Sequence, residues 1–333
     1  MRSFCKESVI VEESLSVNRL AWKLLERLVE NPAFYGVKIR KTESGTTIVD
    51  AGIEATGGFE AGRLITEICM GGLGNAEITC KEYGDITLPS IFVQTDHPVI
   101  ATLGSQYAGW QINEEGYFAI GSGPARALAL KPREIYQEIK YKDDFEKAVV
   151  VLETDKQPPA KLIERIVKDC TVSAEGMAMI LTPTKSMAGA TQVSGRIVET
   201  GIHKLRKVGL DPNVILHAWG IAPIAPIHPK SANAMARTND AILYGGTAYY
   251  TVKYDDEEEL QKIVEKAPAK ASKDYGRPFL EILKEAKYDF YKIDPNLFAP
   301  AVIIVNNERT GGTFKSGEIN VEALAESFTI KTQ

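Results

Sequence analysis

The chain is poor in the residues that bind metals or form disulfides. Its 333 residues include four cysteines and four histidines, and none of them forms a C-x-x-C or H-E-x-x-H motif. Such motifs mark zinc sites and redox disulfides, so we predict no metal ligand among the site residues. Cys5, Cys69, Cys80 and Cys170 are expected to be buried or inert thiols in a reducing compartment.

Long apolar runs and basic tracts are also missing. The net charge is −5, and no hydrophobic segment reaches the length of a membrane span. These absences argue against nucleic-acid and membrane partners. Residues 1–5 lack the apolar core of a signal peptide, so a cytoplasmic location is expected. A G-x-S-x-G motif is absent too, which leaves no sign of a nucleophilic serine.

What is present is an alternation of helix and strand patterns along a chain long enough for two domains. Apolar periodicity predicts helices at residues 16–28, 60–70, 125–130, 159–169, 190–207, 257–266 and 278–287. Strands are predicted at residues 37–40, 46–50, 91–95, 99–102, 117–120, 145–152, 177–181, 214–218, 241–244, 248–252 and 301–305. This alternation predicts a mixed α/β (α+β) fold.

Short motifs recur in the same order in the two halves of the chain, at an offset of roughly 131 to 137 residues. The pairs are residues 61–67 with 194–200, His97-Pro98 with His228-Pro229, and Tyr107-Ala108-Gly109 with Tyr244-Gly245-Gly246. Matches this short also arise by chance. A real duplication predicts two similar α/β domains, residues 1–145 and 146–333, with a ligand pocket between them, although strands can cross over at this boundary.

An arginine and a glutamate lie three residues apart in the predicted helix 190–207. Arg196 and Glu199 fall on one face of that helix, and the apolar neighbours Val193, Ile197 and Val198 indicate that this face meets the interior. A guanidinium and a carboxylate in a cleft can hold and activate a water molecule. The alternative is a surface ion pair of small energetic value.

The segment Gly121-Ser122-Gly123-Pro124-Ala125-Arg126 joins a predicted strand to a predicted helix. Free backbone N–H groups at a helix start attract anions, and Arg126 would add a charge-assisted contact. Arg126 replaces the third glycine of a G-x-G-x-x-G fingerprint, and the segment lacks the Lys-Ser/Thr of a P-loop. A phosphate cradle and a simple tight turn both remain open.

Other candidate ligand contacts are glycines and short polar side chains. Gly71, Gly72 and Gly109 would let the backbone approach a flat ligand closely. The polar candidates, whose ordinary roles would be helix capping and turn formation, are Asp96, Thr184, Ser186, Asn239 and Asp240.

Together these segments resemble the methenyltetrahydromethanopterin cyclohydrolase family. The likeness lies in residues 16–18, 60–73, 121–127, 193–204, 222–229 and 238–241, and it runs through nearly the whole chain. The resemblance implies a cytoplasmic homotrimer of two-domain subunits with a deep pocket between the domains. It also implies that no metal, cofactor or prosthetic group is needed.

The reaction that the resemblance implies belongs to one-carbon metabolism. Water would add to the methenyl-tetrahydromethanopterin cation and give formyl-tetrahydromethanopterin, a pterin substrate whose far end carries a phosphate-bearing acidic tail. The family's catalytic arginine and water-activating glutamate match Arg196 and Glu199. The rival hypotheses are a pterin-binding protein without activity and a nicotinamide- or flavin-dependent oxidoreductase.

Overall fold

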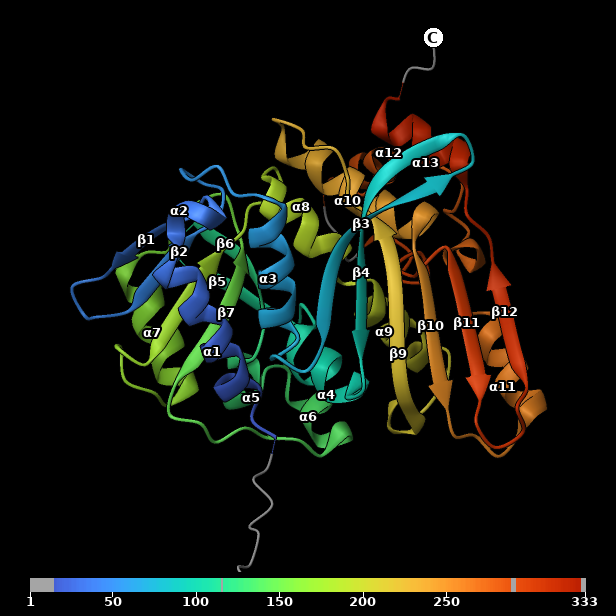
Figure 1. Ribbon diagram of the computed structural model, residues 1–333, viewed down its shortest axis with the longest axis horizontal. Helices are drawn as coiled ribbons and strands as arrows, with labels where there is room; N and C mark the ends of the chain where they lie inside the picture. Colours follow the sequence, from blue (N-terminus) through green and yellow to red (C-terminus); the bar gives the residue numbers. More distant parts are fainter. Residues whose placement is uncertain (1–14, 115, 289–291, 331–333) are drawn as a thin grey trace, which may run out of the picture.

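The computed structural model describes residues 15–114, 116–288 and 292–330, which form two six-stranded sheets and the helices around them (Figure 1). In spatial order, the first sheet contains β1 (Lys38–Lys41), β2 (Thr47–Asp50), β8 (Met177–Leu181), β7 (Ala148–Glu153), β6 (Tyr117–Ser122) and β5 (Trp110–Glu114). The second contains β12 (Thr313–Gly317), β11 (Val302–Asn307), β10 (Thr247–Val252), β9 (Ile215–Pro223), β4 (Ile86–Thr95) and β3 (Asn75–Tyr83). The predicted mixed α/β class is confirmed.

The helices fall before, between and after these strands. The α-helices are α1 (Val17–Glu30), α2 (Pro32–Tyr35), α3 (Phe59–Cys69), α4 (Pro98–Ala101), α5 (Ala125–Ala129), α6 (Arg133–Ile139), α7 (Ala160–Cys170), α8 (Met187–Ser194), α9 (Ile197–Lys207), α10 (Ser231–Gly245), α11 (Glu257–Glu265), α12 (Phe279–Glu285) and α13 (Val321–Phe328). Shorter turns are the π-helix η1 (Thr102–Gln106) and the 3₁₀-helices η2 (Pro212–Val214) and η3 (Ala269–Ala271). None of the described helices is long and apolar enough to cross a bilayer.

The two sheets each draw strands from both halves of the chain. β3 and β4 precede residue 145, yet β4 pairs with β9 in the second sheet. β7 and β8 follow residue 145, yet β8 pairs with β2 in the first sheet. The predicted boundary therefore does not separate the sheets, and the division into two similar domains stays a prediction.

The first sheet is buried on both faces. Val149 and Val151 of β7 share a core with α1 and α3, whereas Val150 and Leu152 share a second core with α7. This arrangement follows from the alternation of side chains along a strand. Helix α1 begins at Val17, one residue after the predicted start, and the hydroxyl of Ser16 caps it by accepting a hydrogen bond from the backbone N–H of Arg19.

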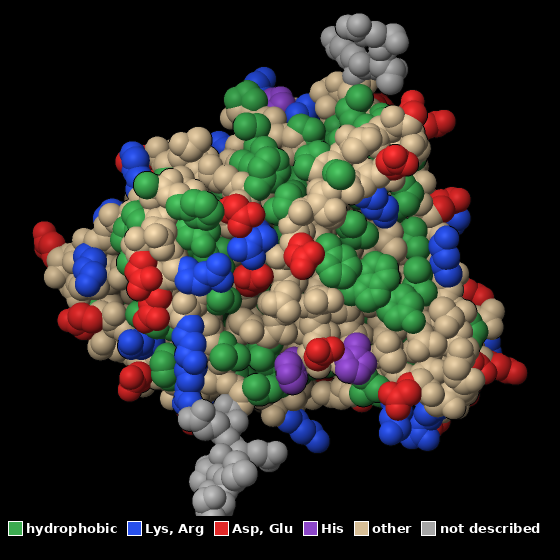
Figure 2. All heavy atoms as spheres, viewed as in Figure 1, with side chains coloured by type: hydrophobic (Ala, Val, Ile, Leu, Met, Phe, Trp, Pro, Cys, Tyr) green, Lys and Arg blue, Asp and Glu red, His purple; other side chains and the backbone are tan. Residues whose placement is uncertain are grey.

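Along β9 and β10, the described helices cover one face of the second sheet only. On the covered face, Ala218 and Tyr250 share a core with α9 and α11. The opposite face carries Phe92, Trp219 and Tyr249, whose rings follow one another at centroid distances of 5.9 and 5.5 Å. In Figure 1, no described helix lies over the viewer's side of β4, β9 and β10, and Figure 2 shows hydrophobic side chains gathered there.

Helices α3 and α8 pack against each other between the two sheets (Figure 1). An added Cβ at Gly62 would lie 2.4 Å from the Thr191 Cβ, and one at Gly195 would lie 2.4 Å from the Thr66 Oγ1. Glycine is needed at both positions because the two backbones approach so closely. This contact places the end of α8, and therefore the start of α9, in the middle of the molecule.

The prediction of one continuous helix at residues 190–207 was wrong. Helix α8 ends at Ser194 and α9 begins at Ile197. Gly195 packs closely against Thr66 of α3, and its carbonyl accepts a hydrogen bond from the side-chain amide of Gln106 at 3.1 Å. The break therefore lies where two segments distant in sequence contact the backbone.

Two predicted strands are also helical. Residues 99–102 belong to α4 and η1, where Pro98 takes the first helical position. Residues 241–244 belong to α10, whose buried C-terminal half is apolar on several sides and so lacks helical periodicity in the sequence. Of the cysteines, Cys69 and Cys170 are buried and Cys80 is exposed, whereas Cys5 lies outside the described residues.

Replacement of Gly201 by alanine tests the packing of α9 on β10. An added Cβ would lie 1.9 Å from the hydroxyl oxygen of Tyr250, which donates to the Val198 carbonyl at 2.9 Å. We expect this clash to outweigh the roughly 1 kcal/mol gain in helix propensity and to lower the free energy of unfolding by about 1–3 kcal/mol. Denaturant titration measures the change.

The double variant Gly201→Ala/Tyr250→Phe removes the nearest clashing atom and should recover part of the lost stability. A single variant as stable as the parent, or more stable, would contradict this packing.

Candidate active site

A cavity of about 470 Å³ lies between strands of the first sheet and the helices α8, α9 and α10. One wall comes from the first sheet and the loop before it, and a second comes from α8 and α9. The third comes from α10 and the segment before β11. The lining residues are Tyr107, Ala108, Gly109, Gln111, Ile120, Glu153, Val193, Arg196, Glu199, Thr200, His203, Lys207, Met235, Thr238, Asn239, Ile242, Leu243, Ile293, Pro295 and Phe298.

Glu199 lies in the first turn of α9 and is only 6% exposed. Burial raises the pKa of its carboxyl to about 7, although Arg196 and Arg126 both act to lower it. The start of a helix also favours a carboxylate through the helix dipole. Among the described residues, no hydrogen bond reaches the Glu199 carboxylate, so its oxygens are left for a ligand or a water molecule in the cavity.

Arg196 is held by several acceptors at the break between α8 and α9. Its Nη1 donates to the Gln106 carbonyl at 2.6 Å, and its Nη2 donates to the Ser122 hydroxyl at 2.8 Å and the Gln192 Oε1 at 3.3 Å. Nη1 also lies 3.9 Å from the Glu199 Oε2. The guanidinium is thus oriented by other groups and acts on Glu199 through its charge. Both side chains are buried, so a surface ion pair is excluded.

The π-helix η1 supplies the other half of this arrangement. Gln106, its last residue, donates through its side chain to the Gly195 carbonyl and accepts through its own carbonyl from Arg196. π-Helical turns are rare and often occur at functional sites. Here the turn places Gln106 where it bonds both Gly195 and Arg196, the two residues between α8 and α9.

Next to Glu199, two aromatic rings stack in the cavity wall. The ring centroids of Tyr107 and His203 lie 5.0 Å apart with an interplanar angle of 20°. Burial, together with the charges of Lys207 and Arg206, lowers the pKa of His203 to about 4. The imidazole is therefore neutral near pH 7, and its buried Nδ1 has no hydrogen-bond partner in the described part of the chain.

Two more of the predicted contacts line this cavity, Gly109 and Asn239. Asp240 follows Asn239 in the sequence but does not line the cavity. It is 1% exposed and accepts hydrogen bonds from the backbone N–H of Phe279 and the hydroxyl of Ser327. Asp240 therefore joins α10 to α12 and α13, which is not the ligand contact that was predicted.

The predicted phosphate cradle is occupied by the protein itself. Arg126 is fully buried, and its guanidinium donates to the carbonyls of Leu103, Ser105 and Lys131. The backbone N–H of Gly123 donates to the Ser105 carbonyl as well. Arg126 therefore holds η1 against the start of α5, where it cannot grip a phosphate in solvent. Gly121, packed against Trp110, is equally internal, and Ser122 serves Arg196.

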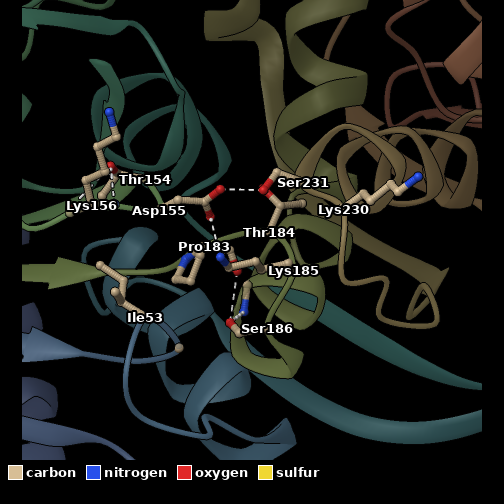
Figure 3. A network of polar contacts seen from close by, with 12 residues as sticks. Ile53, Thr154, Asp155, Lys156, Pro183, Thr184, Lys185, Ser186, Lys230 and Ser231 are labelled. Atoms are coloured by element: carbon tan, nitrogen blue, oxygen red, sulfur yellow. Dashed lines mark hydrogen bonds and ion pairs between the residues drawn. The ribbon is translucent and has the colours of Figure 1, made fainter. Parts of the chain in front are cut away.

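The predicted contacts Thr184 and Ser186 lie in the loop between β8 and α8 (Figure 3). The Thr184 hydroxyl donates to the Glu153 Oε1 at 2.5 Å, and Glu153 lines the cavity. The Ser186 hydroxyl caps α8 by accepting from the backbone N–H of Gly189. Figure 3 also shows Asp155 between Lys185 and Ser231, which links this loop to the start of α10.

Gly71, Gly72 and Asp96 do not reach the cavity that holds Glu199. Gly71 and Gly72 adopt positive φ angles of 68° and 69° and end α3 against α1. Gly72 and Asp96 line a different hollow of about 440 Å³ on the uncovered face of the second sheet, where the Asp96 Oδ1 lies 2.9 Å from the His217 Nδ1. The structure thus separates these three residues from the Arg196–Glu199 pair.

Several cavity residues were missed by the sequence interpretation. His203 and Lys207 follow Glu199 at intervals of four residues, which places all three on one face of α9. That spacing could have identified them. Tyr107 had no comparable signal, because its position depends on η1. Within the described residues, no three His, Cys, Asp or Glu side chains come close enough to share a metal ion.

Comparison with known proteins identifies the family of this chain. The family model described as Cyclohydrolase (MCH) matches residues 16–328. The chain belongs to the methenyltetrahydromethanopterin cyclohydrolase family. The resemblance drawn from the sequence motifs is thereby confirmed.

Relatives of that name are found in several methanogens. The protein of Methanothermobacter marburgensis is 44% identical over 319 residues, which cover 94% of this chain and 99% of the relative. That of Methanocaldococcus jannaschii is 44% identical over 316 residues, or 94% and 98% of the two chains. That of Methanosarcina barkeri is 44% identical over 318 residues, or 95% and 99%.

The effect of the Arg196 charge on the pKa of Glu199 should be measurable by titration. We expect a carboxyl resonance with a pKa near 7, assigned by its loss in Glu199→Gln, in a ¹³C-NMR titration. Arg196→Met removes the larger of the two charges that lower this pKa, so the value should rise further. A pKa that stays the same or falls in Arg196→Met would contradict the electrostatic coupling.

Proposed function

We propose that the chain catalyses the addition of water to the methenyl-tetrahydromethanopterin cation, with Glu199 as the general base. The observation that carries this proposal is the Glu199 carboxylate in the cavity, buried, without a hydrogen-bond donor among the described residues, and 3.9 Å from Arg196. A base of this kind is most effective when its pKa lies near the working pH, and burial raises the pKa of Glu199 to about 7.

The charge of the substrate complements the cavity. The methenyl carbon lies between two nitrogens that share a positive charge, so it is electrophilic. Glu199 attracts that cation, and the cation in turn favours the ionised form of Glu199. Arg196 acts in the same direction, since its charge lowers the pKa of the carboxyl.

In the proposed reaction, Glu199 acts first as a base and then as an acid. The water oxygen bonds to the methenyl carbon while Glu199 takes one of the water protons. Protonated Glu199 then gives this proton to a ring nitrogen as the carbon–nitrogen bond breaks. The remaining hydroxyl proton leaves to solvent as the formyl carbonyl forms, so each turnover releases one proton.

We also propose roles for other residues in or near the cavity. Gly109 and Asn239 line the cavity and are proposed to contact the pterin, whereas Ser122 is proposed to orient Arg196. The cavity is proposed to be the pocket between two domains that the family resemblance implies. The same resemblance supports a cytoplasmic location and a homotrimer, and we propose both.

Glu199→Gln tests the proposed base directly. We expect kcat to fall by a factor of about 100 to 10,000 because the amide cannot accept a proton from water, while the fold is retained. The assay follows the absorbance of methenyl-tetrahydromethanopterin. Glu259→Gln, at the corresponding third position of α11, is the matched control and should keep the parent rate.

A Glu199→Gln variant with the parent kcat would reject Glu199 as the base. A parent protein that binds the methenyl compound but leaves its absorbance unchanged would instead support a pterin-binding protein without activity.

The uncovered face of the second sheet supports the proposed trimer. Trp219 pairs across the sheet with Gln94 on one side and Tyr249 on the other, and Ile304 follows in the same row. Together with Phe92, the side chains of Trp219, Tyr249 and Ile304 form an apolar patch, which is typical of a protein interface. We expect Trp219→Lys to convert the trimer to smaller species, as measured by light scattering after gel filtration.

Phe34→Lys is the control for this experiment, because Phe34 is 72% exposed on α2, away from the second sheet. A Trp219→Lys variant that remains a trimer would contradict the assignment of this face.

A further inference from the structure

Helix α9 presents three chemically different side chains to the cavity. Glu199, His203 and Lys207 follow one another at intervals of four residues and all line it. Since a helix rises 1.5 Å per residue, Glu199 and Lys207 begin about 12 Å apart along the helix axis. The cavity therefore has a carboxylate at one end of this row, an aromatic ring in the middle and an ammonium group at the other end.

The ammonium group of Lys207 is available for a ligand. Its neighbour Arg206 is already paired, since its Nε donates to Glu138 at 2.8 Å. The charge of Asp294 acts to raise the pKa of Lys207. The Asp294 carboxylate itself accepts hydrogen bonds from the Ser272 hydroxyl at 2.7 Å and from the backbone N–H of Asn296 at 3.0 Å. Among the residues that the structure describes, no carboxylate lies within ion-pair distance of Lys207.

The distribution of charge along the cavity gives a bound molecule a direction. Glu153 and Glu199 place carboxyl groups in the lining, whereas Lys207 is exposed at the C-terminal end of α9. Arg196 lines the same end as Glu199, but its guanidinium already donates to Gln106, Ser122 and Gln192. An anionic group is therefore favoured next to Lys207 over the end that holds the two carboxyls. Between them lies the ring of His203, which is stacked on Tyr107.

We propose that Lys207 binds an oxyanion, a phosphate or a carboxylate, at the far end of an elongated substrate that lies lengthwise along α9. The reacting carbon lies at Glu199, and the flat part between the two ends lies beside the ring of His203. This inference rests on the proposed function and adds to it the orientation of the substrate. It also moves the anion site from Gly121–Arg126, where Arg126 is fully buried and its Nε and Nη1 donate to the protein's own carbonyls, to the end of α9.

Lys207→Met should raise KM for methenyl-tetrahydromethanopterin about tenfold, because one charge-assisted contact is lost. The kcat should stay within about twofold, since Lys207 takes no part in the proton transfer. Lys207→Arg keeps the charge and should restore KM to near the parent value. Lys262→Met, on the exposed face of α11, is the control for a loss of positive charge outside the cavity.

A second measurement identifies the part of the substrate that Lys207 contacts. A methenyl pterin that lacks the acidic end should bind the parent protein and Lys207→Met equally well. Inorganic phosphate should compete with the full substrate in the parent protein, and this competition should be lost in Lys207→Met. An equal KM in the parent and Lys207→Met, or a KM that rises equally in Lys262→Met, would overturn the inference.

Equilibrium binding, measured in parallel by the absorbance of the methenyl compound, separates this inference from the proposed function. If the parent protein shows no turnover but Lys207→Met still weakens binding, the proposed function fails and the Lys207 contact stands. If turnover is present and Lys207→Met binds as tightly as the parent, the Lys207 contact fails and the proposed function stands.

Discussion

The buried guanidinium of Arg196 is the interaction on which the rest of the site depends. A cation in the interior is costly unless its donors are satisfied and an opposite charge is near. Gln106, Ser122 and Gln192 provide the acceptors, and Glu199 provides the charge. These groups come from η1, β6, α8 and α9, so formation of the site requires both the first sheet and the central helices to be in place.

Local patterns were enough to predict the elements that depend on local interactions. The helix α1, the strands β1 and β2, and the apolar strands β7 and β8 follow from side-chain chemistry within a few residues. The break at Gly195 could not be found in this way, because it depends on Thr66 and Gln106, which are far away in the sequence. The helical state of residues 241–244 was hidden for a related reason, since burial on several sides removes the periodicity.

The residues of the candidate site also differ in whether local patterns could predict them. The spacing of Arg196 and Glu199 was visible in the sequence, and the structure places both in one cavity. The glycine-rich segment 121–126 suggested an anion site, but Arg126 is buried and donates to the carbonyls of η1, and the sequence gives no sign of a π-helix there. His203 and Lys207 needed only the helical spacing from Glu199, whereas Tyr107 needed the fold.

The central claim is that ionised Glu199 takes the proton from water, and the pH dependence of kcat/KM for methenyl-tetrahydromethanopterin tests it most directly. Burial raises the pKa of this carboxyl to about 7, so the active, ionised form is lost as the pH falls below that value. The account predicts that kcat/KM rises with pH through a midpoint near 7 and reaches a plateau above it. A value that stays constant between about pH 5 and pH 9, or that falls as the pH rises, would contradict it.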